Sequence, residues 1–286
     1  MEFRRASSTG LGVAAAAAAL FSLSACGSMT GIGDTDFSDG ASVSDRVSAV
    51  RLDTRSGDVR VVAREGATTR VNWTLHYFGE RPEQPPFQVD NGTLVLSGCP
   101  ETADRCSADY DVVVPAGTPV TGSTNSGKVS LEQVAEVELT TSSGDVTVRG
   151  VAGDVGLRTN SGAVIVSDVA GAVRLESNSG RVELSELHQG MTVRTGSGDV
   201  AASAIGGGRV DLDVRSGDAT VALVDRQDVT AKVTSGDLTL TVPAGAYQVN
   251  SQTDSGDAEI GVTQDPTADH RLDLTARSGR LSVGQG

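Results

Sequence analysis

Aromatic side chains are scarce in this sequence of 286 residues, in which Phe, Tyr and Trp together make up 3%. A compact core normally draws much of its buried area from these residues, so Val, Leu, Ala and Thr must form it here. Val and Thr favour strands over helices. Basic residues are also few: 23 Lys and Arg stand against 37 Asp and Glu, for a formal charge of −14. This acidic balance leaves no basic face and excludes nucleic acid as a partner.

Catalytic motifs are missing as well. The three histidines, His76, His188 and His270, are scattered, and none has a second His or a Cys at metal-ligand spacing. No G-x-S-x-G motif occurs in a strand-turn-helix context, and G-G-G at 206–208 lacks the Lys and the helix of a phosphate loop. We therefore expect no enzyme activity. A surface-polysaccharide enzyme is a remote alternative, because β-helical folds do host such enzymes.

The N-terminus has the pattern of an export signal. Two arginines precede an apolar run at 11–23, which is shorter than the roughly 20 residues of a membrane-spanning helix. The run ends in L-S-A-C-G, which resembles the lipobox of bacterial lipoproteins, and this resemblance implies a lipid on Cys26 that attaches the protein to the membrane. The alternative is an ordinary secretory signal with an incidental cysteine. We predict a lipoprotein signal peptide at 1–25, a flexible tether at 26–42 and a lipid-anchored position on the outer face of the bacterial cell membrane.

Two further cysteines, Cys99 and Cys106, lie close together in S-G-C-P-E-T-A-D-R-C. An exported chain with two close cysteines is expected to join them in a disulfide. Metal binding is the alternative, but no histidine lies nearby to complete a site.

Glycine is abundant, at 35 residues, and much of it belongs to a repeated Ser-Gly pair. Ten of the Ser-Gly pairs begin at Ser56, Ser126, Ser143, Ser161, Ser179, Ser197, Ser216, Ser235, Ser255 and Ser278. From Ser126 onward the successive spacings are 17, 18, 18, 18, 19, 19, 20 and 23 residues. Such regular spacing indicates stacked repeats, each too short for a helical hairpin.

Apolar and polar residues alternate on both sides of each pair, as in Val155, Leu157 and Thr159 before one pair and Val164 and Val166 after it. A period of two indicates half-buried strands. Antiparallel hairpins would also satisfy it, but stacked coils explain why the same corner returns in every unit. We therefore predict an all-β, single-stranded parallel β-solenoid (β-helix-like) with about 18 residues per coil and strands about 4.8 Å apart.

Each Ser-Gly pair is predicted to form a stacked corner, in which Gly adopts a positive φ and Ser points inward with its hydroxyl hydrogen-bonded. The corner residues are Ser143, Gly144, Ser161, Gly162, Ser179, Gly180, Ser197, Gly198, Ser216, Gly217, Ser235, Gly236, Ser255 and Gly256.

The few aromatic residues are concentrated where the period breaks. This segment holds the only Trp, Trp73, together with the Pro-rich loop R-P-E-Q-P-P and two cysteines. Because a solenoid must cover the open end of its core, we interpret the aromatics as a cap rather than as a ligand pocket. We predict one repeat domain at 43–286, with an irregular, disulfide-bearing N-terminal cap at 57–120 and regular coils at 121–286.

Asp follows the Ser-Gly pair in four consecutive C-terminal units, at Asp199, Asp218, Asp237 and Asp257. If these units stack in sequence order, like charges lie about 5 Å apart, with ~1 kcal/mol of repulsion per pair in water. Either the carboxylates fan into solvent and the corner geometry outweighs the repulsion, or they form a ladder that binds Ca²⁺ weakly. The G-G-x-G-x-D nonapeptide of calcium-binding β-rolls is absent from the sequence. No other cofactor is expected.

The T-x-S-G-D-V corners, the V-P-A-G phrases and the lipobox together resemble a "putative adhesin" family of β-strand repeats over residues 43–286. This is a toast-rack-like domain of unknown function in bacterial surface proteins, and some of its members are associated with envelope stress. The resemblance implies no catalytic residues. It implies a non-catalytic binding or adhesion role toward an unknown envelope or surface ligand. The alternative is an envelope-stress sensing accessory protein that acts through a membrane partner.

Overall fold

The computed structural model describes residues 34–83, 86–100 and 105–286, and in these residues every regular element is a strand. The predicted signal peptide, Cys26 and the first part of the predicted tether lie outside the described residues. The described part of the chain has no helix that is long and apolar enough to cross a membrane.

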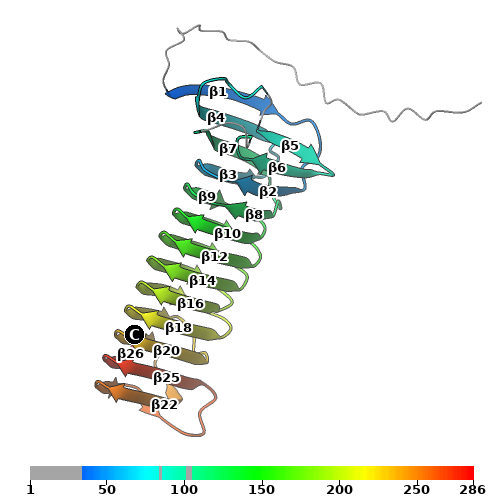
Figure 1. The fold of residues 1–286 in the computed structure, drawn as a ribbon. Coiled ribbons are helices and arrows are strands. Elements are labelled where there is room, and N and C mark those ends of the chain that lie inside the picture. Colours follow the sequence, from blue (N-terminus) through cyan, green and yellow to red (C-terminus); the bar gives the residue numbers. More distant parts are fainter. Residues whose placement is uncertain (1–33, 84–85, 101–104) are drawn as a thin grey trace, which may run out of the picture. The chain divides into compact units, whose positions relative to one another are not determined.

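Two sheets of 13 strands each carry the fold (Figure 1). In spatial order, sheet A consists of β1 (Asp34–Ser42), β4 (Arg70–Phe78), β7 (Ser107–Pro115), β3 (Val59–Arg64), β9 (Val129–Glu132), β11 (Val146–Val151), β13 (Val164–Val169), β15 (Val182–Leu187), β17 (Val200–Ile205), β19 (Ala219–Leu223), β21 (Leu238–Val242), β26 (Leu281–Gln285) and β23 (Ala258–Ile260). In the same direction, sheet B consists of β5 (Phe87–Asp90), β6 (Thr93–Ser97), β2 (Ala49–Thr54), β8 (Val120–Thr124), β10 (Val137–Ser143), β12 (Val155–Ser161), β14 (Val173–Ser179), β16 (Met191–Ser197), β18 (Val210–Ser216), β20 (Val229–Ser235), β25 (Arg271–Ser278), β22 (Ala246–Ser255) and β24 (Thr263–Gln264).

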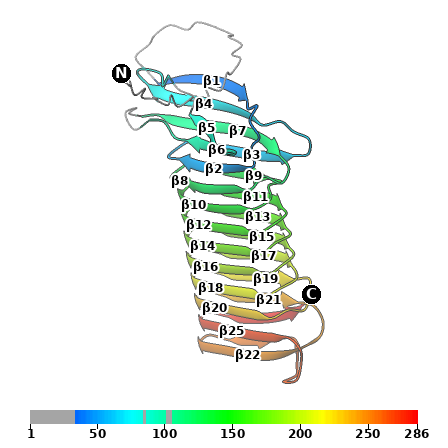
Figure 2. The ribbon, with the colours of Figure 1, turned by 90° about the vertical axis from the view of Figure 1, so that its right-hand side faces the viewer.

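One coil consists of a strand in sheet B, a Ser-Gly corner, a strand in sheet A and a second corner (Figure 2). In β12 and β13, the inward side chains Val155, Leu157, Val164 and Val166 are at most 4% exposed. The next coil pairs in parallel and in register, so that Val173 lies beside Val155. Each such buried side chain contributes ~1.5–3 kcal/mol, and the inward rows of all coils join into one core. The coils average about 19 residues, which confirms the predicted β-solenoid.

A left-handed residue interrupts the alternation near the end of several sheet A strands. In β11, Val146, Val148 and Val151 are buried, so the period of two breaks before the last of them. Gly150 there has a φ of +68°, and Ala204 at the same place in β17 has a φ of +54°. This extra residue acts as a bulge that returns the next apolar side chain to the core.

The prediction of a flexible tether at 26–42 is wrong for its second half. Residues 34–42 form β1, which pairs antiparallel with β4 from Asp34 opposite Phe78 to Ser42 opposite Arg70. Phe37 and Ala41 pack against the core from this edge strand. The strand escaped notice because Asp39 lies between these two residues on the same face and interrupts the apolar pattern.

The coils do not stack in sequence order at the C-terminal end (Figure 1). Strands β25 and β26 lie between the coil β20–β21 and the coil β22–β23, so Ser278 pairs with both Ser235 and Ser255. The long segment from β22 to β25 makes this insertion possible, because it carries the chain outward and back. Stacking in sequence order, the condition on which a ladder of four aspartates depended, therefore fails at this end.

The N-terminal end is interleaved in the same way. In space, the coil of β2 and β3 lies between the pair β6 and β7 and the coil of β8 and β9. In sequence, β6 and β7 instead follow β3 and precede β8. Part of the segment 57–120 that we predicted to be irregular is thus a regular coil strand, namely β3.

Beyond β6 and β7, antiparallel strands cover the end of the core. Trp73 of β4 and Phe87 of β5 come from opposite sheets, and their ring centroids lie 5.3 Å apart. Trp73 is 5% exposed, which confirms that it belongs to the core cover. The Cys99–Cys106 disulfide is present in this region, as predicted, with the two Cα atoms 5.8 Å apart.

Candidate functional site

The Ser-Gly corners show why glycine recurs. Gly144, Gly162, Gly180, Gly198 and Gly217 have φ values between +117° and +126°, which confirms the predicted positive φ. Stacking adds a second requirement, because a Cβ atom on Gly198 would overlap the carbonyl oxygen of Gly180 in the preceding coil. Side chains other than hydrogen are therefore excluded both by the backbone conformation and by the neighbouring coil.

The corner serine does not point inward, contrary to the prediction. Ser143, Ser179 and Ser197 are exposed, because the chain already turns away from the core at the residue before the glycine. The buried hydroxyl belongs instead to the residue two positions earlier. The Thr159 hydroxyl, for example, donates to the carbonyl oxygen of Ser161 at 3.1 Å. This bond satisfies a buried polar group that would otherwise cost ~1–3 kcal/mol.

The aspartate of the corner phrase links one coil to the next. The carboxylate of Asp199 accepts a hydrogen bond from the backbone N–H of Asp218 at 3.0 Å, and Asp218 accepts one from Asp237 at 2.9 Å. Asp237 accepts from the N–H of Arg280 at 2.8 Å, so Asp257 is not its neighbour. The predicted ladder of four consecutive aspartates therefore has three members, because the coil of Arg280 is inserted before the coil of Asp257.

This row offers no assembled metal centre. No group of three or more His, Cys, Asp or Glu side chains in the described ranges is placed to hold a metal ion. The backbone hydrogen bonds explain the recurring aspartate without calcium, since each one offsets the like-charge repulsion between neighbouring coils.

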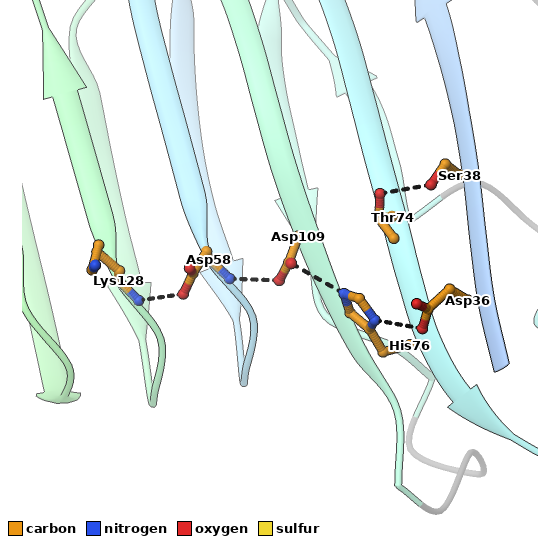
Figure 3. Close-up of polar contacts among 7 residues, drawn as sticks. All are labelled: Asp36, Ser38, Asp58, Thr74, His76, Asp109 and Lys128. Carbon is orange, nitrogen blue, oxygen red and sulfur yellow. Dashed lines mark hydrogen bonds and ion pairs between the residues drawn. The ribbon is translucent and has the colours of Figure 1, made fainter. Parts of the chain in front are cut away.

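At the N-terminal end the same row reaches a histidine (Figure 3). Asp58 accepts from the N–H of Lys128 at 2.8 Å, and Asp109 accepts from the N–H of Asp58 at 2.8 Å. The second carboxylate oxygen of Asp109 lies 3.1 Å from Nε2 of His76, and Asp36 lies 2.7 Å from Nδ1. His76 of β4 thus joins the edge strand β1 to β7.

The two carboxylates raise the pKa of His76 above its ordinary value. The hydrogen bond with Asp36 is the largest cause, the hydrogen bond with Asp109 is second, and burial acts in the opposite direction. Sequence reasoning treated His76 as isolated, because its partners come from strands that are distant in the chain and meet only through antiparallel pairing.

A depression of about 390 Å³ lies on this part of sheet A, lined by Asp58, Asp109 and Lys128 among others. Its polar groups are largely engaged with one another, and both ring nitrogens of His76 face carboxylates. A general base needs a free nitrogen within reach of the proton that it removes, and this ring offers none. The cluster is therefore best explained as a fastening of the cap.

The outer face of sheet B carries a second, more open groove of about 590 Å³. Two rows of side chains border it and run along the stack. The inner row, three positions before each corner serine, is Thr140, Arg158, Glu176, Arg194 and Asp213. The rim row, one position before each corner serine, is Ser142, Asn160, Asn178, Gly196 and Arg215.

The charges of the inner row alternate and pair loosely. Glu176 lies 3.3 Å from Arg158 and 3.9 Å from Arg194, and all three side chains are more than half exposed. Exposed pairs of this kind are worth ~0–1 kcal/mol, so they exchange partners readily. Arg215 on the rim has no ion-pair partner in the described part of the chain. This groove therefore keeps polar groups available for a ligand, in contrast to the His76 cluster.

Sequence reasoning missed the groove, although a signal was present. Arg158, Glu176, Arg194 and Asp213 each precede a corner serine by three residues, so the sequence predicts their alignment once the coils are stacked. The same alignment also predicts that the charges alternate along this row.

Comparison with known proteins identifies the class. The family model Toastrack DUF4097 matches residues 107–284, more than half of the chain, and the chain therefore belongs to this family. A comparison with curated proteins gave no match.

Several solved structures match this chain at low sequence identity. A "putative adhesin" from Parabacteroides distasonis is 15% identical with a TM-score of 0.46, covering 87% of this chain and 97% of that one. A "putative adhesin" from Bacteroides fragilis is 14% identical with a TM-score of 0.31, covering 88% and 98%. A "putative cell adhesion protein" from Clostridium sporogenes is 9% identical with a TM-score of 0.28, covering 88% and 100%.

Proposed function

We propose that the chain is a lipid-anchored, extracytoplasmic β-solenoid that binds an envelope or surface ligand without catalysis. The observation that carries this proposal is the sheet B groove, whose exposed polar rows keep weakly engaged groups over five successive coils. A stack of similar corners holds those rows at a fixed spacing. Such rigidity favours binding, because the backbone of the site loses little conformational entropy when a ligand binds.

The absence of catalysis is supported by the chemistry of the one histidine cluster. His76 has no ring nitrogen free to act as a base, and Asp58 and Asp109 are engaged by backbone N–H groups. These contacts support a structural role for the most elaborate polar cluster in the described residues.

Membrane attachment is proposed through the lipobox cysteine. Seven residues, 27–33, separate Cys26 from β1, and seven extended residues span at most about 25 Å. A lipid on Cys26 would thus keep the cap near the membrane while the stacked coils extend the binding face beyond it. The same short connection favours a second candidate function, envelope-stress sensing, in which the cap contacts a membrane partner.

The proposal is tested by expressing the full chain and Cys26→Ala in an exporting bacterium. We expect the wild-type protein to enter the detergent phase with a mass that includes the lipid, and to be retained on envelope fragments when purified in detergent. Cys26→Ala should be released or should remain as uncleaved precursor. Unchanged partitioning and mature mass for Cys26→Ala would refute the anchor, and failure of the wild-type protein to bind envelopes would refute the binding role. Crosslinking in cells to a membrane protein through the cap would favour sensing.

A further inference from the structure

The sheet B groove has a periodicity that restricts the shape of its ligand. Its rows run along the stack, and equivalent side chains recur at each coil, about every 4.8 Å. A ligand that lies along the groove and repeats at this distance meets the same kind of group in each coil. Across five coils, this register is maintained over about 19 Å.

An extended peptide does not repeat at this distance. Its residues advance by about 3.3 Å, and those on one side recur every ~6.6 Å, so a peptide along the groove falls out of step within two coils. A linear chain of pyranose rings advances per ring by a length close to the coil spacing. Ser142 and Thr140 offer hydroxyls to the hydroxyls of a sugar. Asn178 donates to the amide oxygen of Asn160 at 3.0 Å, and the remaining amide donor and acceptor groups of these two residues can also bind sugar hydroxyls.

The charge of the groove indicates an acidic ligand. Three arginines, Arg158, Arg194 and Arg215, stand against Glu176 and Asp213, so the groove is positive by 3 − 2 = +1 on a chain of formal charge −14. No aromatic ring lines it, so stacking on sugar faces is not available and guanidinium–anion contacts must supply the affinity. Arg158 and Arg194 lie two coils, about 9.6 Å, apart, which suits anionic groups on alternate rings.

We propose that the groove over β10 to β18 binds a linear acidic glycan along the axis of the stack, with Arg158, Arg194 and Arg215 contacting its carboxylates. This inference rests on the proposed binding function and names its ligand class. Glu176 competes with the glycan for Arg158 and Arg194, because it already lies 3.3 Å and 3.9 Å from them.

The test uses mature protein purified in detergent and a fluorescent oligogalacturonate long enough to span the groove. We expect saturable binding that weakens with salt, about fivefold weaker for Arg194→Gln and for Arg215→Gln, and stronger for Glu176→Gln. The matched control is Arg149→Gln, which removes the same charge from the exposed face of sheet A and should bind like wild type. Far-UV circular dichroism verifies that all four variants are folded.

Three outcomes would overturn the proposal. One is equal loss of binding in Arg149→Gln and Arg194→Gln, which would mean general charge attraction. Another is equally tight binding of polyglutamate, which carries the charge without the ring spacing. The third is retention on envelope fragments with no affinity for oligogalacturonate, and this result would leave the general binding function standing.

Discussion

Replacing Gly198 by alanine tests the stacked corner directly. The residue has a φ of +126°, where an L side chain is strained by ~1–3 kcal/mol. The added Cβ atom would also overlap the carbonyl oxygen of Gly180, so the two coils must separate. Separation weakens the hydrogen bond from Gly180 N–H to the carbonyl oxygen of Ser197, which joins these two coils, at ~1 kcal/mol. We expect Gly198→Ala to lower the free energy of unfolding by roughly 2–4 kcal/mol.

Gly66 provides the matched control. It lies in the turn between β3 and β4 with a φ of +65°, and a Cβ atom there would meet nothing within 4 Å. Gly66→Ala should therefore cost only the left-handed backbone strain, ~1–2 kcal/mol. Urea unfolding followed by circular dichroism measures both variants. An equal or smaller loss in Gly198→Ala than in Gly66→Ala would refute the argument from stacking.

Three further predictions concern side chains. Asp199→Ala should lower the unfolding free energy by ~1–2 kcal/mol through loss of the bond to Asp218, whereas Asp199→Asn should change it little, and thermal melts with Ca²⁺ and with chelator should coincide. Because the folded-state pKa of His76 is raised, its stabilisation is complete below the unfolded value near 6.5 and is lost as pH rises through the folded pKa. His76→Gln should abolish this pH-dependent contribution to the free energy of unfolding. We expect the contribution to be below ~1 kcal/mol, because the His76 side chain is 40% exposed. Urea unfolding of both proteins at acidic and at alkaline pH measures it. Reduction of Cys99–Cys106 should cost ~2–3 kcal/mol, and alkylation of both thiols without reductant would contradict the bridge.

The repeated coil was predictable because it is encoded locally in every unit. The alternation around each Ser-Gly pair specifies two strands, and the recurrence of the pair specifies parallel stacking, since like corners must share one edge. Gly198 was assigned a positive φ on these grounds, and the structure confirms it. The disulfide between Cys99 and Cys106 followed from their proximity in an exported chain.

What could not be predicted depends on contacts between distant segments. The spacings before Ser255 and Ser278 fit sequential stacking as well as the observed insertion, because the corner phrase does not say which coil is its neighbour. His76 acquires its role only after β1 and β7 flank β4. The two rows of the sheet B groove could have been predicted from the sequence, but only by aligning the residues before each corner serine coil by coil.

The number of middle coils in this protein is independent of the strands that cover the two ends of the stack. At each end of the stack, one coil is inserted out of sequence order: β2 and β3 at the N-terminal end, and β25 and β26 at the C-terminal end. The middle coils from β10 to β19 follow sequence order and are joined by equivalent corners. A recombination event that duplicates or deletes one whole middle unit therefore creates one new junction between matching corners and leaves both ends of the stack intact. Evolution can therefore change the length of such a protein in steps of one coil. Each step changes the length of its outer face by about 4.8 Å and thus the length of ligand that this face can contact.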